Sequence, residues 1–491
     1  MKFTCSFLLA ASAVILPSVA AGLDKRAAID DCLTAAKVPV FASASSDRTQ
    51  AIKPFNLRVP FTPTAYAVPQ TVKHVQDAVA CGVKNSVKVT AKCGGHSYGS
   101  HGLGGENGHL IVDLRRLNNV TVDTKAHTAV IGAGGRLGNI ALALYSQGKQ
   151  AMSHGTCPGV GIGGLTLHGG YGLISRQKGL TLDNLVSAQV VLANSSVVTA
   201  SATENTDLFW SLRGAGAAFG IVTSFTFKTF DAPESNLVYS YTMQSSSAAE
   251  MANQLAILQN FTLYDQPAEL GMRIFLNSGQ LTGVYYGTKE NYNKTMLPLL
   301  SKLKITAKDS AVSAKGWTDT LLAFSNGDLK QPEPYDYHET QYAKSLMPDR
   351  LSTAALNSLS NYFFSTARSI GRPYYLLIDM HGGNNSAISQ VAADATSYAH
   401  RNAVFKMQFY DIAWGGSYNS AWYSFLNNWV KAITDASPGE KFGMYINYAD
   451  TQLSNSEAHT RYWGNHYEKL AGLKAKYDPG KVFYGPQLVG S

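Results

Sequence analysis

Hydrophobic positions in the first half of the chain switch repeatedly between helical spacing and the spacing of strands. Val72, Val75 and Val79 recur at helical spacing in Thr71–Ala80, and Gly82 follows as a stop signal. Further helices are predicted at Ala27–Val38, Leu137–Gln147 and Glu204–Leu212, and strands at Ser86–Thr90, Leu110–Leu114, Thr128–Ile131, Leu185–Leu192, Val197–Ala200 and Phe219–Phe230. This mixture predicts an α+β unit.

The pattern changes near Asp231–Glu234, where we place a domain boundary. Helices are predicted after it at Ala248–Tyr264, Leu351–Phe363, Ile388–His400 and Ser417–Ala436, and strands at Leu270–Asn277, Gly283–Gly287, Tyr374–His381, Ala403–Tyr410 and Gly443–Tyr448. Helices packed on one face of an antiparallel sheet are the arrangement that this order favours. A capping box at Ser454–Glu457 opens the last helix, which ends before Asp478.

The chain begins with the features of a secretory signal over residues 1–22: a lysine, an apolar run and then small residues. Lys25-Arg26 resembles a second processing point, so residues 23–26 form a candidate propeptide and the mature chain starts near Ala27. No later apolar run reaches the ~18–20 residues that span a bilayer. We therefore expect a secreted protein without a membrane partner.

Length, charge and cysteine content narrow the class further. The 491 residues suggest two or three domains. The net charge is +8, but the sequence has no run of basic residues longer than a pair, which argues against a nucleic-acid partner. Five sequons fit the secretory route, at Asn119, Asn194, Asn260, Asn293 and Asn384. Cys32 and Cys81, each at a predicted helix, are the expected disulfide; a second disulfide between Cys93 and Cys157 stays open.

Two glycine-rich stretches, Lys92–Gly99 and Ser153–Gly172, combine glycines with histidine and cysteine. Glycine lets backbone N–H groups approach a bulky ligand, and rows of such groups cradle phosphates, although either stretch alone is also compatible with a structural turn. His96, His154, His168 and Cys157 are candidate metal ligands by type. Their spacing matches no zinc pattern and neither loop holds a carboxylate, so no metal is predicted.

Several longer motifs resemble one family: flavoprotein oxidases related to berberine bridge enzyme and to fungal glucooligosaccharide and chitooligosaccharide oxidases. The motifs are Gly94–Tyr98, Ser153–Pro158, Asp207–Trp210 with Arg213-Gly214, His381–Gly383, Gln408–Asp411, Tyr445–Asp450 and Lys474–Pro479. The resemblance covers essentially the whole mature chain. It implies a two-subdomain FAD-binding domain of the p-cresol methylhydroxylase and vanillyl-alcohol oxidase type over residues 27–232, a substrate-binding domain over 233–440, and a segment over 441–491 that returns to the FAD domain.

The resemblance also implies FAD attached covalently through His96 and Cys157. The other positions that it assigns to the cofactor are Gly94, Gly95, Ser97, Gly155, Pro158, Gly161, Gly163, Gly164, Gly172, Val222, Tyr445 and Asn447. Tyr448 matches the family's catalytic tyrosine and Asp379 its carboxylate partner. An ionised Asp379 nearby raises the pKa of a tyrosine above its usual ~10, so we expect a relay in which Asp379 accepts the phenolic hydrogen bond while Tyr448 takes the substrate proton.

The positions that match the sugar groove of the carbohydrate oxidases are Tyr98, Thr156, Glu339, Tyr375 and Gln408. The function that follows is oxidation of the reducing-end anomeric hydroxyl of an oligosaccharide by a monomeric enzyme, with O2 as acceptor. Two alternatives stay open: a flavin oxidase of a secondary metabolite, and a sugar-binding flavoprotein without useful turnover.

Overall fold

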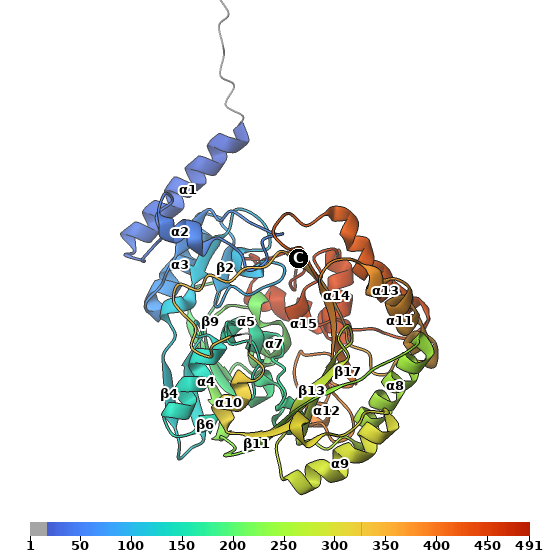
Figure 1. Ribbon diagram of the computed structural model, residues 1–491. Helices are drawn as coiled ribbons and strands as arrows, with labels where there is room; N and C mark the ends of the chain where they lie inside the picture. The colour runs from blue at the N-terminus through green and yellow to red at the C-terminus, as the bar shows by residue number, and fades with distance from the viewer. Residues whose placement is uncertain (1–16, 326) are drawn as a thin grey trace, which may run out of the picture.

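The computed structural model describes residues 17–325 and 327–491, and Figure 1 shows their arrangement. The α-helices are α1 (Pro17–Ala35), α2 (Ser46–Ala51), α3 (Val72–Lys84), α4 (Leu137–Ser146), α5 (Ile162–Leu167), α6 (Ser175–Lys178), α7 (Thr206–Ala215), α8 (Ala248–Asn260), α9 (Lys289–Lys302), α10 (Trp317–Leu322), α11 (Thr353–Ser365), α12 (Ala387–Gln390), α13 (Tyr423–Asp435), α14 (Asn455–Trp463) and α15 (Tyr467–Tyr477). Within this described part, no helix has the length and apolar character needed to cross a membrane.

Two sheets come from the N-terminal half of the chain. A parallel sheet has the order β1-β3-β2, from Ala65–Ala67, Leu110–Asp113 and Val89–Lys92. An antiparallel sheet has the order β4-β5-β9-β7-β8, from Val120–Asp123, Thr128–Gly132, Ile221–Lys228, Leu185–Val191 and Val197–Ser201. A short pair joins β6 (Gln150–Ala151) to β10 (Phe230–Asp231). This α+β mixture is the one that the alternating patterns predicted.

The second half of the chain builds a seven-stranded antiparallel sheet of order β14-β11-β13-β12-β16-β17-β15. Its strands are Val312–Lys315, Asn236–Thr242, Gln280–Tyr285, Leu270–Phe275, Tyr374–Met380, Phe405–Ile412 and Gln341–Leu346. Figure 1 shows α8, α11 and α13 along the outer side of this half. Trp429 of α13 contacts the Phe409 ring of β17 at 5.5 Å between centroids, so helices cover one face and leave the other to the site. The predicted antiparallel sheet with helices on one face is confirmed.

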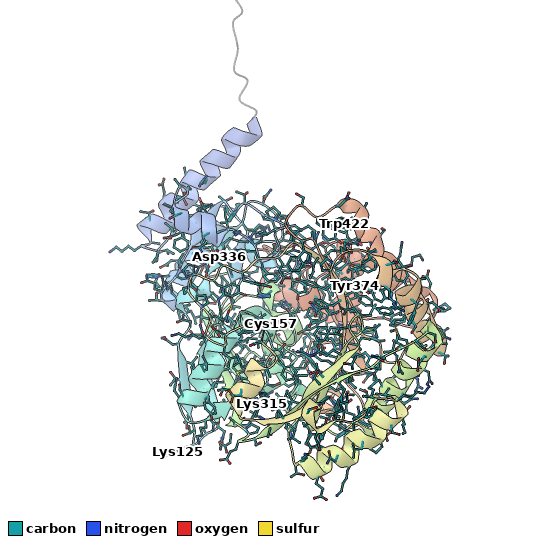
Figure 2. The ribbon with its side chains drawn as sticks, in the orientation of Figure 1. Lys125, Cys157, Lys315, Asp336, Tyr374 and Trp422 are labelled. Carbon is teal, nitrogen blue, oxygen red and sulfur yellow. A yellow bond between two sulfur atoms is a disulfide. The ribbon has the colours of Figure 1, made fainter. Side chains whose placement is uncertain are left out.

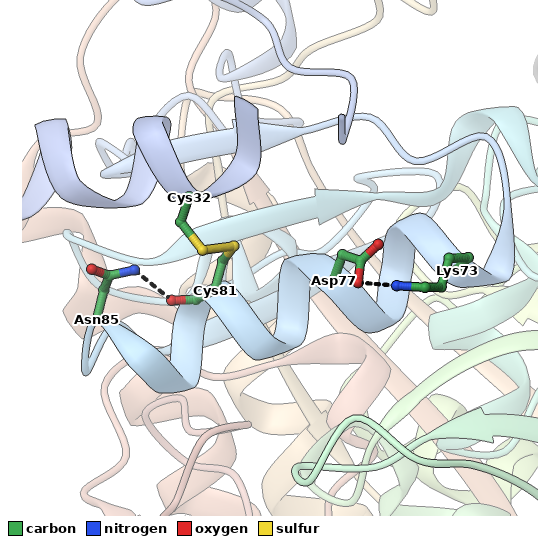
Figure 3. Close-up of a disulfide and its surroundings, with 5 residues drawn as sticks. All are labelled: Cys32, Lys73, Asp77, Cys81 and Asn85. Atoms are coloured by element: carbon green, nitrogen blue, oxygen red, sulfur yellow. Dashed lines mark hydrogen bonds and ion pairs between the residues drawn. A yellow bond between two sulfur atoms is a disulfide. The ribbon is translucent and has the colours of Figure 1, made fainter. Parts of the chain in front are cut away.

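A disulfide ties the N-terminal helix to the fold: Cys32 of α1 is bonded to Cys81 of α3, as predicted (Figure 3). Cys93 and Cys157 are free, so the alternative of a second disulfide between them is wrong. Helix α1 starts at Pro17 rather than Ala27, and its alanine-rich sequence favours this extension. Residues 1–16 of the predicted signal lie outside the described residues.

Three local predictions are wrong, each because tertiary contacts override the local pattern. Residues 388–400 hold only the end of α12, and the segment beyond it is irregular because Ser397 and Tyr398 donate backbone hydrogen bonds to the carbonyls of Trp210 and Arg213. Residues 443–448 contribute one β-bridge at Gly443 and a 3-10 turn, not a strand. Helix α3 continues through Gly82, where a Cβ would lie 2.3 Å from Val89 Cγ2, so glycine serves close packing there.

Candidate active site

A cavity of about 410 Å³ lies between the two glycine loops and the uncovered face of the seven-stranded sheet. Figure 2 shows Cys157, which lines it, near the centre of the molecule. Among the predicted site residues, those lining the cavity are Gly94, Gly95, His96, Ser97, Tyr98, Gly155, Thr156, Cys157, Gly161, Gly163, Gly164, Gly172, Val222, Tyr375, Asp379, Gln408, Tyr445, Asn447 and Tyr448. The motifs that lie far apart in the sequence therefore meet in one place.

Two predicted residues, Pro158 and Glu339, are not among those that line the cavity. The carbonyl of Pro158 accepts a hydrogen bond from the backbone N–H of Gly138, at 3.0 Å, which anchors the second loop to helix α4. The Glu339 carboxylate accepts hydrogen bonds from the hydroxyl groups of Tyr410 and Tyr337, the latter at 2.6 Å. The Pro158 contact holds the second loop, and the Glu339 contacts hold two tyrosines.

The two glycine loops are packed backbone against backbone. A Cβ on Gly161 would lie 2.2 Å from the Gly94 nitrogen and 2.4 Å from Cys93 Sγ, so these glycines are required for the loops to meet. Arg136 Nη1 donates to the carbonyl oxygens of Gly94, at 2.9 Å, and Gly159, at 2.6 Å, which joins one loop to the other. The histidine and cysteine loops thus form one rigid unit.

The cavity wall fits a large cofactor with hydrogen-bonding groups. Gly164 has no atom within 4 Å of the position of a Cβ, so its backbone is open to an approaching group. The His168 side chain is buried, and its Nε2 has no hydrogen-bond partner among the described residues. Because Nδ1 of this neutral ring donates to the Gly164 carbonyl at 3.0 Å, Nε2 is a buried acceptor that needs a donor, and a hydroxyl group of a bound dinucleotide such as FAD would supply one there. Across the described residues no cluster of three or more histidine, cysteine or acidic side chains suitable for a metal was found.

The two predicted attachment residues face the cavity from opposite loops. The His96 ring stacks on Phe55 at 3.8 Å between centroids, and burial, helped by Arg136, lowers its pKa to about 3. The imidazole is therefore neutral, which leaves a ring nitrogen lone pair for bonding to carbon. Burial raises the pKa of the Cys157 thiol, and the positive charge of Arg273 opposes that rise. The Tyr445 hydroxyl oxygen accepts from the Gly170 N–H at 3.0 Å and so links the C-terminal segment to the second loop.

Three strands of the sheet present their side chains to the cavity in cross-strand rows. In the antiparallel register Arg273, Asp379 and Lys406 are neighbours and form a charged row. Two residues further along each strand, Phe275, Leu377 and Gln408 form a mixed row, and Tyr375 and Tyr410 form an aromatic row after it. Because strand side chains alternate in direction, the odd residues of β17, such as Phe409, face the helices instead.

Lys406 is the main functional residue that the sequence interpretation missed. Its Nζ is ion-paired with the Asp379 carboxylate and lies 2.8 Å from the Tyr448 hydroxyl oxygen, so the lysine stands between the two residues predicted to bond directly. The buried Asp379 thus has the partner that its position in an apolar strand demanded. Burial and then the Asp379 charge raise the pKa of Tyr448 well above its ordinary value, as the sequence argument expected. Lys406 is two residues before Gln408, a predicted substrate residue, in a predicted strand. Residues two apart in a strand face the same side, and this spacing could have shown that Lys406 faces the cavity.

An aromatic and amide cluster borders this charged row. Tyr98 stacks on Tyr448 at 5.8 Å between centroids. Gln408 Nε2 donates to the hydroxyl oxygens of Tyr98, at 2.9 Å, and Tyr375, at 3.1 Å. Tyr375 in turn stacks on Tyr410 at 4.8 Å. Flat rings with polar tips suit a sugar, which has C–H faces and a rim of hydroxyls.

Arg273 is a second residue that the sequence interpretation left without a role. Its Nη1 is 3.5 Å from Thr156 Oγ1, and its guanidinium lies over the rings of Phe275 and Phe324. Its Nε is buried without a partner in the described part of the chain. The guanidinium therefore has donors free for a ligand beside Tyr448.

The predicted glycosylation sites differ in exposure. Asn293 is half-buried in α9, whereas the exposed ones are Asn119, Asn194, Asn260 and Asn384. Modification of all five stays a prediction.

Comparison with known proteins identifies the family. The model for the FAD binding domain matches residues 63–201, and the berberine and berberine-like model matches residues 444–490. A xylooligosaccharide oxidase of Thermothelomyces thermophilus is 44% identical over 95% of each chain, and a glucooligosaccharide oxidase of Sarocladium strictum is 41% identical over 96% of each.

Solved structures agree. The xylooligosaccharide oxidase of Myceliophthora thermophila C1 in complex with xylobiose superposes with a TM-score of 0.91 at 44% identity, covering 94% of this chain and 99% of the other. Glucooligosaccharide oxidase from Acremonium strictum, described with 6-S-cysteinyl, 8α-N1-histidyl FAD, superposes with a TM-score of 0.90 at 40% identity over 94% and 99%. The chain belongs to the FAD-linked oxidoreductases of the berberine-bridge-enzyme-like family, and it carries that family's FAD-binding domain among near relatives that are fungal oligosaccharide oxidases.

Proposed function

We propose that this protein is an oligosaccharide oxidase that converts the reducing-end anomeric hydroxyl to a lactone, which hydrolyses to the aldonic acid, while O2 is reduced to H2O2. The observation that supports it most is the meeting of Tyr448, Lys406 and Asp379 beside His96 and Cys157 in one cavity. A proton relay next to two attachment residues for a flavin is what alcohol oxidation requires.

The proposed cofactor is FAD, bonded through a ring nitrogen of His96 and Sγ of Cys157. Support comes from the neutral His96 ring, the free Cys157 thiol and the doubly linked FAD described for the Acremonium strictum enzyme. When bound, FAD supplies an acceptor for the hydride of the anomeric carbon and passes the electrons to O2. Gly164 and His168 would contact the cofactor, while Gly161 holds the two loops together.

The protein's part in the chemistry is to receive the hydroxyl proton. Lys406 Nζ, an ammonium paired with Asp379, gives a proton to that carboxylate, and its freed lone pair takes the phenolic proton of Tyr448 while Tyr448 Oη takes the hydroxyl proton as the C–H bond breaks. Charge is conserved, because the neutral phenol and the ammonium are restored while the carboxylate becomes protonated. Because Lys406 and Asp379 are buried, water is excluded from this path and does not exchange protons with it.

Attachment is tested by intact mass after deglycosylation. Wild-type protein should carry the mass of one FAD, and His96→Ala and Cys157→Ala should each keep it through the remaining bond. Only the double variant should release flavin on denaturation. A wild-type mass without that increment would contradict the proposed linkage.

Activity is tested by following H2O2 with xylo-, cello-, malto- and chito-oligosaccharides. Anaerobic bleaching of the flavin by sugar is the companion measurement, because a protein that only binds sugar would keep its oxidised spectrum. Turnover of aromatic alcohols with silence on every oligosaccharide would replace the proposal with oxidation of a secondary metabolite.

We also propose that the protein is secreted after removal of residues 1–22, trimmed after Arg26, and monomeric. The disulfide Cys32–Cys81 supports an oxidising route. N-terminal sequencing of protein from the culture medium, with its sedimentation coefficient, tests these points. A mature chain that retains the first 22 residues would contradict them.

A further inference from the structure

One tryptophan of this protein lies on the surface. Of its six tryptophans, Trp210, Trp317, Trp429 and Trp463 are buried and Trp422 is half-buried, but Trp414 is 78% exposed. A side chain of this size loses favourable burial when it stays in water. Single exposed apolar residues are common on protein surfaces, so exposure alone does not indicate a binding site. The position of Trp414 relative to the cavity is what suggests one.

Trp414 lies just beyond the end of β17, the strand that brings Lys406 and Gln408 to the cavity. Counted in steps of two from Tyr410 through Ile412, Trp414 is the next position in the cavity-side register, two residues past the strand end, where the chain bends. It follows Tyr410 by four residues, so at most about 13 Å of chain separates the two. Trp414 is not among the residues that line the cavity, and it lies outside it.

The surrounding contacts fix Trp414 beside a predicted substrate residue. The backbone N–H of Ala413 donates to the carbonyl of Thr340 at 2.8 Å, so Trp414 and Glu339 flank this bond on adjacent strands. After the exposed stretch 414–417, the Tyr418 hydroxyl donates to Asp411 Oδ2 at 2.6 Å. The segment that carries Trp414 is thus held at both ends.

We propose that Trp414 is a platform for a distal sugar ring of a longer oligosaccharide whose reducing end lies at Tyr448. The proposal rests on the proposed function of the same site. The flat C–H face of a pyranose would cover the indole, which combines removal of apolar area from water with dispersion contacts. The platform lies farther from Lys406 than two linked sugar rings extend, so it selects chain length without contacting the reacting ring.

The test compares chain lengths in four holoenzymes: wild type, Trp414→Ala, Trp414→Phe and Tyr264→Ala. Tyr264 is 55% exposed near the end of α8 and serves as a control for loss of an exposed aromatic. We expect wild-type KM to fall from the disaccharide to the hexasaccharide. Trp414→Ala should raise KM for the hexasaccharide roughly tenfold, leave the disaccharide unchanged and keep kcat. Trp414→Phe should keep a KM for the hexasaccharide close to that of wild type, because an aromatic ring remains. Tyr264→Ala should behave as wild type.

Equal effects of Trp414→Ala on disaccharide and hexasaccharide, or no effect on either, would overturn the platform. A change in sedimentation coefficient would assign Trp414 to a contact between copies or to a protein partner instead. Tryptophan fluorescence during titration with hexasaccharide provides a readout without turnover, as the difference between wild type and Trp414→Phe. If no sugar is oxidised, the proposed function fails. A fluorescence change that wild type shows and Trp414→Phe lacks would still support the platform in that case. No fluorescence change in wild type would reject the platform.

Discussion

At the scale of single residues, the central finding is that a lysine separates the tyrosine from the carboxylate. Lys406 donates to Tyr448 Oη and is paired with Asp379. A buried ion pair is strongly destabilised when one partner is removed, because the other charge stays uncompensated. We therefore expect the charged row to matter for folding as well as for the proposed proton transfer, and variants must separate the two roles.

The first prediction concerns the proton acceptor. Tyr448→Phe keeps the ring that stacks on Tyr98 and removes the hydroxyl, so the yellow protein should fold with its flavin attached. Flavin reduction by sugar should slow by roughly 10²–10⁴-fold, the usual contribution of a positioned acid or base. Anaerobic stopped-flow absorbance measures it. Reduction at a near-normal rate would remove Tyr448 from this role.

The second prediction separates charge from chemistry at Lys406. Lys406→Met should lower the free energy of unfolding by about 3–5 kcal/mol, because Asp379 is left buried and unpaired. Lys406→Met with Asp379→Asn removes both charges and should recover most of that stability, yet flavin reduction should stay slow. Urea unfolding and stopped-flow reduction report the two effects. Recovery of both together in the double variant would show that the pair acts only through folding.

Sequence reasoning reached most of these residues but not their connection. His96, Cys157 and Tyr448 lie in local motifs, so the order of amino acids around each of them is enough to identify it. Lys406 gives no local signal of its partners, because only the register between β16 and β17 places it opposite Asp379. Pairing of strands is a long-range property, and the pattern of one strand does not encode its neighbour's register.

At the scale of elements, the decisive feature is the contact between the two glycine loops. Gly94 and Gly161 face each other without room for a side chain, whereas Gly164, three residues later, is open toward the cavity. Glycines in one short stretch therefore serve two purposes. One purpose is packing of loop on loop, and the other is access for the cofactor.

The third prediction uses these glycines as a matched pair. Gly161→Ala places a methyl group 2.2 Å from the Gly94 nitrogen and should lower stability by about 1–3 kcal/mol, as overpacking does. Gly164→Ala meets no protein atom within 4 Å, so its stability should match wild type while less flavin is incorporated. Melting temperature and the flavin-to-protein ratio distinguish them. Equal melting temperatures for the two variants would refute the close loop contact.

Elements stabilised by their own local sequence pattern could be predicted, whereas elements stabilised by contacts with distant residues could not. Helix α4 and the hairpin β7–β8 were predicted nearly to the residue, because a local periodic pattern determines them. The helix expected at residues 388–400 fails because its backbone bonds to residues near 210 and 213, an alternative that no window of local sequence contains. Local preference was outweighed there by tertiary hydrogen bonds.

At the scale of the whole molecule, neutral histidines are buried throughout the fold. Burial lowers the pKa of His381 to about 3 and of His101, His168 and His400 to about 4. Unfolding returns each toward ~6.5, so between these values the unfolded chain binds more protons than the native protein. The slope of unfolding free energy against pH is then positive, and stability is lost as the pH falls below ~6.5.

The fourth prediction follows from that sign. The melting temperature should fall steadily from pH ~6.5 to ~4.5, and each such histidine should contribute up to about 1.4 kcal/mol per pH unit. His400→Gln, which changes a residue outside the cavity, should flatten the dependence. Circular dichroism melts across this range measure it. A melting temperature that is constant or rises on acidification would contradict the neutral state of these rings.

The row arrangement of the sheet floor has a consequence for how such enzymes diversify. In the proposed function, proton transfer uses the charged cross-strand row, and the rows beyond it lie at increasing distance from that row. Under the proposed function, substitutions of Phe275, Leu377 or Tyr375 should therefore alter which sugar is accepted without changing the charged row. The strand register thus separates the proposed catalytic positions from the proposed recognition positions. A library of variants confined to the outer rows should yield new sugar specificities while the pH profile of flavin reduction stays unchanged.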